Sequence, residues 1–246
     1  IAEDFDNVGF IIGDPESNIT SILVTLDTTE DVVEEAINKG CNLIVSYHPI
    51  IFNGLKQITN DNYVQKSVIK AVKNNISVYA IHTSLDNHPK GISYLLSNLI
   101  GLKNISVLLK KKEKLNKIKR GMGSIGELEK PVYEITFFDL LKNKLGLKYI
   151  RHSNKLNKKI SKVSVVVGSG SFAIKDSIES NVDAFITSDF KYHNFFEADN
   201  KAILIDIGHY ESEKHIKMFI KEFLNKKLPN FTVLLSEQNI NPVNYY

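Results

Sequence analysis

Short apolar runs alternate with amphipathic segments in the first third of the chain. The runs typical of β-strands are residues 22–26 (ILVTL), 43–46 (LIVS) and 78–81 (VYAI). The segments between them, residues 30–39 and 62–74, place apolar side chains on one helical face. This order predicts a β-α-β-α-β unit.

The same alternation returns after the middle of the chain. The strand-like runs are residues 163–167, 184–187 and 202–205, and the helical segments are residues 172–180 and 192–199. A further helix over residues 211–226 and a strand over 232–235 complete the pattern. Strands separated by helices favour parallel pairing with right-handed crossovers. We therefore predict an α/β fold with two similar layered α/β halves that arose by internal duplication.

The boundary between the halves falls in a less regular region, residues 121–161. We place an N-terminal α/β half at residues 1–121 and a C-terminal α/β half at residues 122–246, and expect a metal site between them. Ligands of open α/β sheets gather at the carboxyl ends of the strands, so the residues that follow each run are the candidates for function.

Composition narrows the class of protein. The chain has 246 residues, of which 43% are hydrophobic and 24% charged, as in globular proteins. Its 31 basic and 28 acidic side chains give a net charge of +3, too near balance to indicate nucleic-acid binding. The lysine-rich run at residues 110–120 and the lysines of 142–162 are interpreted as solvated surface, and nucleic-acid binding through them remains the minor alternative.

A single cysteine, Cys41, excludes an internal disulfide framework and a multi-cysteine zinc site. No apolar run reaches the roughly 18 to 20 residues of a membrane span. We expect a cytoplasmic protein whose metal ligands, if it has them, are histidines and carboxylates.

Several such side chains follow the predicted strands. His48 follows the second run with one residue between, and Asp86 follows the third. His209 and Glu213 are four residues apart at the start of a predicted helix, which places them on one face. Glu211 and His215 have the same separation, so spacing alone does not decide which of the two pairs binds a metal. His209 is nearer to the strand end, which favours the first pair.

Two further segments are polar enough to contact a ligand. The turn Gly168–Ser171 (GSGS) either cradles a phosphate at a helix N-terminus or is an ordinary strand-to-helix turn. Asp189, Lys191 and His193 either contact a substrate, support the metal ligands or lie in a surface loop.

Four motifs together resemble a known family, the GTP cyclohydrolase 1 type 2 homologues, or NGG-interacting factor three-like proteins. They are residues 2–10 (AEDFDNVGF), 46–52 (SYHPIIF), 82–86 (HTSLD) and 208–213 (GHYESE). The resemblance implies a duplicated α/β fold, a toroidal homohexamer and a site for two metal ions. The ligand positions that it implies are Tyr47, His48, Asp86, His209 and Glu213, which favours His209 and Glu213 over Glu211 and His215.

The sequence departs from the family pattern at Tyr47, where the family usually has the first histidine of a pair. A neutral phenol is a poorer ligand than imidazole, so one of the two metal positions is expected to be weaker. The chain also lacks room for the extra domain of longer members and resembles the short form.

The resemblance implies a metal-dependent hydrolase acting on a nucleotide-like small molecule, with GTP as the substrate that the family name suggests. One or two divalent ions per chain, zinc, iron or manganese, would activate water, and His82 would act as an acid, as a base or as a residue that orients the metal ligands. The alternative is a non-catalytic metal-binding, oligomeric or regulatory protein.

Overall fold

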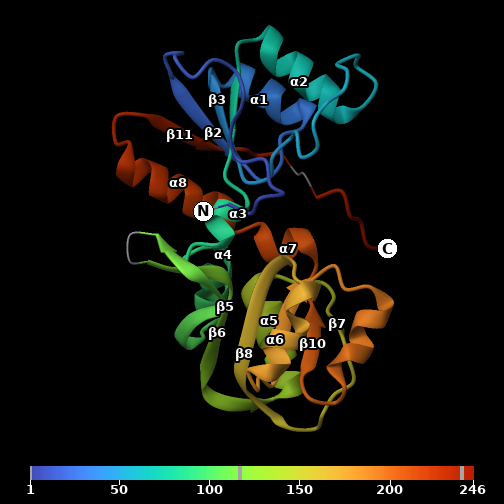
Figure 1. Cartoon of the computed structure of the whole chain (residues 1–246). Helices are drawn as coiled ribbons and strands as arrows, with labels where there is room; N and C mark the ends of the chain where they lie inside the picture. The colour runs from blue at the N-terminus through green and yellow to red at the C-terminus, as the bar shows by residue number, and fades with distance from the viewer. Residues whose placement is uncertain (1, 116–117, 239–240) are drawn as a thin grey trace. The chain divides into compact units, whose positions relative to one another are not determined.

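The computed structural model describes residues 2–115, 118–238 and 241–246 and contains two compact units (Figure 1). One, the split unit, is built from two stretches of chain, residues 2–84 and 214–246. The other, the inserted unit, is the continuous stretch 85–213. Each unit has its own sheet and its own core.

The split unit contains a five-stranded sheet in the order β1-β4-β3-β2-β11. Its strands are β1 (Gly9–Ile12), β2 (Ser21–Thr25), β3 (Leu43–Ser46), β4 (Ser77–Ala80) and β11 (Thr232–Leu235). All neighbours are parallel except β1, which is antiparallel to β4. The carboxyl ends of β2, β3 and β4 therefore meet at one edge.

Helices α1 (Glu30–Asn38) and α2 (Tyr63–Lys73) contribute their apolar faces to the core of the split unit. The hydroxyl of Thr29 accepts a hydrogen bond from the Val32 amide at 3.3 Å and so caps α1. Helix α8 (Ile216–Lys227) packs against β2 and β11. The strand and helix positions predicted from periodicity for residues 22–81 are confirmed.

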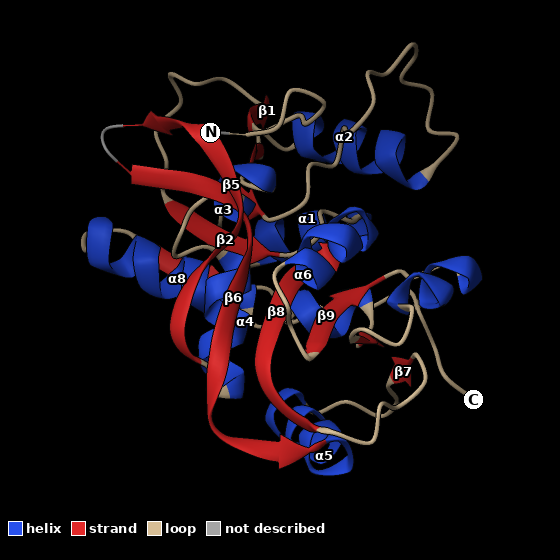
Figure 2. Ribbon diagram, turned by 60° about the horizontal axis from the view of Figure 1, so that its bottom comes forward, coloured by secondary structure: helices blue, strands red, loops and turns tan. Residues whose placement is uncertain are grey.

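The inserted unit contains a six-stranded sheet in the order β5-β6-β8-β9-β10-β7, and Figure 2 shows β6, β8 and β9 side by side. Its strands are β5 (Lys103–Leu115), β6 (Ile118–Tyr133), β7 (Arg151–His152), β8 (Lys159–Ser169), β9 (Ala184–Ser188) and β10 (Ile203–Asp206). Its helical segments are α4 (Ile92–Ile100), α5 (Glu134–Leu145), η1 (Ser171–Ala173), α6 (Ile174–Glu179), η2 (Tyr192–Ala198) and α7 (His209–Glu213). The short α3 (Thr83–Asp86) contains the residue at which the chain passes from one unit to the other.

The two sheets share a four-stranded pattern. In the order β1-β4-β3-β2, the strands β4, β3 and β2 are parallel to one another. The edge strand β1, which comes before them in the chain, is antiparallel to β4. The order β7-β10-β9-β8 repeats this arrangement. The prediction of two similar layered α/β halves is confirmed.

The limits of the units differ from the predicted boundary at residues 121 and 122. Gly121 lies within β6, where it pairs with Lys110 of β5, so a division there would cut through a hairpin. The last strand, β11, joins the first sheet by pairing with β2. The C-terminal segment therefore completes the N-terminal unit.

Other differences concern single elements. The lysine-rich run at residues 110–120, interpreted as solvated surface, contributes to strands β5 and β6, and the irregular region 121–161 contains most of β6 and all of α5 and β7. The helix predicted over residues 211–226 is two helices, α7 and α8. In the part of the chain that the structure describes, no helix is both long enough and apolar enough to cross a membrane.

Candidate metal centre

His48 follows β3 in the split unit and is oriented by an aspartate. The backbone amides of Tyr47 and His48 donate to the carbonyls of Thr25 and Leu26, so the chain beyond β3 stays aligned with the end of β2. His48 Nδ1 lies 2.9 Å from Asp27 Oδ1. Because an ionised carboxylate only accepts, this contact places a proton on Nδ1 of the ring.

His82 follows β4 and is held in the same way by Asp6. Asp6 Oδ1 lies 2.8 Å from His82 Nδ1, and Asp6 Oδ2 accepts from the amide and hydroxyl of Thr83. Burial raises the pKa of the Asp6 carboxyl, but the hydrogen bonds from His82 and Thr83 outweigh it, and the net pKa lies below the usual value. His82 itself has φ +32°, an uncommon conformation for a residue other than glycine.

Aromatic rings surround these two histidines. The Tyr47 side chain is buried, and its ring centroid is 4.9 Å from that of His48 and 5.7 Å from that of His82. Phe52, 6.2 Å from the His82 ring, meets it edge-on and is itself 6.4 Å from the exposed ring of Phe5. The imidazole of His82 therefore contacts two aromatic rings, those of Tyr47 and Phe52.

The inserted unit contributes a histidine and a carboxylate on one short helix. Helix α7 spans His209 to Glu213, and His209 Nε2 lies 3.1 Å from Glu213 Oε1. On the other side of the ring, Nδ1 lies 2.6 Å from Asp189 Oδ2. Hydrogen bonds to Asp189 and then to Glu213, opposed by burial, raise the pKa of His209 to about 10. In the metal-free protein the ring is therefore an imidazolium between two carboxylates.

The backbone around α7 fixes this pair. Gly168 has φ +70°, and a Cβ atom there would lie 2.8 Å from Glu213 Oε1, so only glycine leaves space for the carboxylate. The Gly168 amide donates to the Ser212 hydroxyl at 3.1 Å. The Gly208 amide donates to Asp206 Oδ1 at 3.0 Å immediately before His209. Loop and helix thus position Glu213, whose side chain is only 4% exposed.

The donor set fits a divalent ion. Histidines that bind metals usually donate the other ring N–H to a carboxylate, which orients the ring and increases its basicity. Asp27 and Asp189 do this for His48 and His209. Imidazole and carboxylate together suit zinc, iron or manganese. In each of these two histidines, Nε2 is the nitrogen on the side of the ring away from the aspartate.

Comparison with known proteins assigns the family. The model of the Duf34/NIF3 (NGG1p interacting factor 3) family matches residues 1–242. The chain belongs to the Duf34/NIF3 family. A Clostridium acetobutylicum relative named GTP cyclohydrolase 1 type 2 homolog is 34% identical over all of this chain and 92% of its own length. A Clostridium perfringens protein of the same name is 35% identical over 93% of this chain and 86% of its own.

Solved structures of Duf34/NIF3 relatives share the fold. A hypothetical protein from Staphylococcus aureus superimposes with a TM-score of 0.89 at 30% identity, covering 100% of this chain and 93% of its own. A Bacillus cereus protein related to NIF3 gives 0.88 at 23% identity, with 100% and 94% covered. The alignment with a Staphylococcus epidermidis GTP cyclohydrolase 1 type 2 homolog runs over 351 positions, so that relative has residues that this shorter chain lacks.

The structure distinguishes the two candidate pairs that spacing left open. His209 and Glu213 belong to one helix and contact each other. Glu211 and His215 are divided, because His215 lies beyond α7 at the start of α8 and is exposed. Among the other predicted ligands, Asp86 ends α3 and is half-buried.

The remaining candidates have other surroundings. The Gly168 amide donates its hydrogen bond to the Ser212 hydroxyl. It is therefore not free to bind the phosphate considered for the Gly168–Ser171 turn. Asp189 supports His209, one of the three roles considered for it. Lys191 and His193 lie exposed at the beginning of η2.

Two residues of this Duf34/NIF3 site were missed by sequence reasoning. Asp27 follows β2 at the same strand end as His48, but it reads equally well as a helix cap. Asp6 is 76 residues from His82, and only the fold brings them together. Asp6 lies inside the first family motif, which is the one signal in the sequence that marked it.

Proposed function

We propose that this protein binds a divalent metal ion through His48, His209 and Glu213 and uses it to hydrolyse a nucleotide-like small molecule. The observation that carries the proposal is the environment of His209 in α7. Its Nε2 atom contacts Glu213, and its Nδ1 atom contacts Asp189. His48, oriented by Asp27, supplies a second imidazole. The set offers two imidazole nitrogens and one carboxylate oxygen.

A second ion would use the two remaining family positions, Asp86 and Tyr47. Asp86 offers a carboxylate oxygen, a suitable ligand. Tyr47 offers a buried phenol, which must lose its proton to bind well. The second position is therefore the weaker one, and zinc, iron and manganese are the ions expected.

The chemistry follows from the donors. A divalent ion held by these residues would lower the pKa of a coordinated water to roughly 7 and so supply hydroxide at neutral pH. His82, whose Nδ1 is fixed on Asp6, keeps Nε2 as a proton acceptor beside the ligand His48. Its role in the proposal is to accept or donate the proton of the reaction.

The second candidate function is a non-catalytic metal-binding or regulatory protein. The observation that favours it is the buried Tyr47 phenol at a position where an imidazole would complete a two-metal site. In that case the ion would have protein ligands on every side, as structural metal sites do. By relation to the family we further propose a cytoplasmic homohexamer.

The test is metal content per chain, measured by elemental analysis on the parent and on two matched variants. His209→Ala removes a proposed ligand, whereas His215→Ala removes an exposed histidine outside α7. GTP hydrolysis is assayed on the same samples. We expect the parent and His215→Ala to retain metal and activity and His209→Ala to lose both.

Other results would separate the candidates. Metal that is lost in His209→Ala, with no turnover of GTP or other nucleotides in the parent, would favour the non-catalytic role. A parent that holds no divalent metal after supplementation would contradict the metal site itself.

A further inference from the structure

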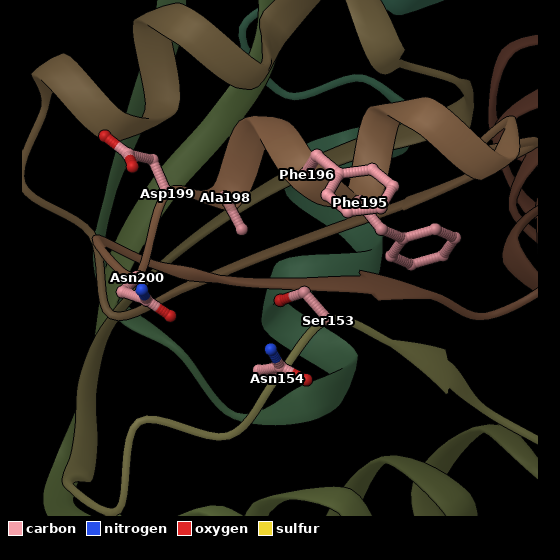
Figure 3. Close-up of a pocket in the computed structure, with 7 residues that line it drawn as sticks. All are labelled: Ser153, Asn154, Phe195, Phe196, Ala198, Asp199 and Asn200. Carbon is pink, nitrogen blue, oxygen red and sulfur yellow. The ribbon is translucent and has the colours of Figure 1, made fainter.

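A second feature of the inserted unit, separate from the residues above, is a groove between η2 and the loop that follows β7 (Figure 3). It consists of two adjoining hollows of about 200 and 300 Å³. Both are lined by Ser153 and Asn154 on one side and by Phe195 and Phe196 on the other. The groove thus has one wall of aromatic rings and one wall with an amide.

The aromatic wall presents ring surface to solvent. Phe196 is 66% exposed and Tyr192, which lines the larger hollow, is 72% exposed. Their ring centroids lie 5.5 Å apart in an edge-on arrangement. Phe195 from the same segment is partly buried and packs on the core residue Phe190. Two large rings, Tyr192 and Phe196, thus remain uncovered on a segment that is anchored in the core through Phe195.

This wall is held rigidly. Arg151 donates to the carbonyl of Phe190 at 2.9 Å and to Asp206 at 3.0 Å, and its guanidinium lies 5.2 Å from the Phe195 ring centroid. The Phe190 amide donates to the same Asp206 carboxylate. These contacts anchor the segment on which Phe196 lies through its neighbours Phe190 and Phe195, and an anchored backbone reduces the entropic cost of binding.

The opposite wall is also fixed, but its amides are available. Ser153 exchanges two hydrogen bonds with Leu204, one through its amide and one through its hydroxyl. Across the described residues, the exposed side-chain amide of Asn154 on this wall makes no hydrogen bond, nor does that of Asn200, which follows η2. An amide offers two donors and an acceptor in one plane. Such amides can pair with the edge of a planar ring held by the aromatic wall.

The charges near the groove do not favour an anion. Arg151 is already paired with Asp206, and Asp199 at the far end is paired with Lys201 at 2.7 Å. A ligand would therefore be recognised through a flat, uncharged ring with hydrogen-bonding groups at its edge. Aromatic side chains combined with amides are the means by which proteins bind unpaired bases.

We propose that this groove binds a purine or pyrimidine base, stacked on Phe196 and contacted at its edge by Asn154. Free nucleosides and single-stranded nucleic acids both carry such a base, and the groove offers contacts to the base alone. The site is independent of the metal ligands and stands whether or not they support hydrolysis.

The test is isothermal titration of the full chain with adenosine, guanosine and uridine, and with a short single-stranded RNA. Base stacking is worth about 1–3 kcal/mol, so Phe196→Ala should weaken binding by roughly 5- to 150-fold. Asn154→Ala should weaken it by about tenfold, as expected for about 1.4 kcal/mol of lost hydrogen bonding. Ribose 5-phosphate should not bind.

Matched controls separate the groove from general effects. Phe172→Ala removes a phenylalanine that is 56% exposed on η1 and does not line the groove, and Asn98→Ala removes an exposed asparagine of α4. Both should bind like the parent, and all four variants should melt as the parent does. Equal affinity for nucleoside and RNA would identify a nucleoside site, and tighter, salt-dependent binding of RNA would identify a single-strand site.

Three results would overturn the proposal. One is a parent that binds no nucleoside or RNA at millimolar concentration. Another is a loss of affinity that is equal in Phe196→Ala and Phe172→Ala. The third combines two observations: the parent binds no base, and Phe196→Ala changes its oligomeric mass. That result would show that the rings contact a second copy of the chain.

Discussion

Three histidines at strand ends, His48, His82 and His209, each turn Nδ1 toward an aspartate. The sequence predicted where the histidines lie, because each follows an apolar run within four residues. It did not predict the pairings, since the aspartates are 20 to 76 residues away in the chain. A residue's position along a strand is local information, whereas its hydrogen-bond partner depends on the whole sheet.

The contact between Asp189 and His209 should control metal affinity. Asp189→Asn keeps the shape of the side chain but removes the charge that orients and polarises the imidazole. Loss of such a partner typically lowers metal affinity about 10- to 100-fold. Competition with a chelator of known affinity measures the change. Asp139→Asn, an exposed aspartate of α5, is the control, and equal affinities in the two variants would contradict the role of Asp189.

Gly168 should be required for the position of Glu213. In Gly168→Ala the new methyl group would lie 2.8 Å from Glu213 Oε1, at a residue with φ +70°. Gly40→Ala is the matched control, because its φ is +67° and no atom lies within 4 Å of the added Cβ. A left-handed alanine costs roughly 1–2 kcal/mol, which both variants share.

We therefore expect Gly168→Ala to be the less stable of the two in urea unfolding. Gly168→Ala should also have the lower metal content of the two variants, because only its added methyl group would meet the Glu213 carboxylate. Similar metal content in both variants would show that Glu213 can move aside without loss of the ion.

At the scale of elements, the strands and helices with clear periodicity were predicted and the charged or short ones were not. Strands β2, β3, β4, β8, β9 and β10 are apolar and buried, so their period was readable. Strand β5 ends in lysine-rich sequence and lies at the edge of its sheet, where, within the described residues, β6 is its one partner. Its lysine-rich end carries no apolar pattern to read, and charge on edge strands protects against aggregation.

Asp183 connects two elements of the inserted unit and should make its stability depend on pH. Its carboxylate accepts from the amides of Ser161 and Lys162, both at 2.9 Å, and thereby joins β8 to the start of β9. Burial raises the pKa of Asp183, but these hydrogen bonds and Lys158 outweigh it and lower the net pKa. Replacement by Asn should cost about 2 kcal/mol at neutral pH.

The sign of the pH effect follows from the lowered pKa. The stabilisation is fully present above the unfolded-state pKa of 3.8 and is lost as the pH falls through the lower native value. The difference in unfolding free energy between the parent and Asp183→Asn should therefore be constant from pH 7 to about 5 and shrink below about 4. A difference that grows on acidification would contradict this account. Urea unfolding at each pH measures it.

At the scale of the whole molecule, one unit is inserted into the sequence of the other. The inserted unit is continuous and has a complete sheet, whereas the split unit needs both ends of the chain. This arrangement was not predicted, because β11 follows the second half in sequence but pairs with β2 of the first. Periodicity identifies a strand without telling which sheet contains it.

The inserted unit should fold when expressed alone as residues 85–213, with a cooperative thermal transition. Residues 2–84 alone should not, because they lack β11, α8 and the hydroxyl of Ser236 that donates to the buried Glu35 at 2.6 Å. Circular dichroism melting of both fragments is the measurement. Cooperative melting of residues 2–84 would show that the first sheet is stable without its last strand.

The pairing of β11 with β2 also orders events during synthesis. At about 5–20 residues per second, the ribosome needs on the order of 10 s to add the residues between the first stretch of the split unit and the second. Throughout that interval β2 is exposed along the edge that β11 later covers, while the inserted unit can already close around its own core. The inserted unit, whose synthesis begins second, can therefore complete its fold first. The split unit, whose strands are made earliest, completes its sheet only when β11 has been synthesised.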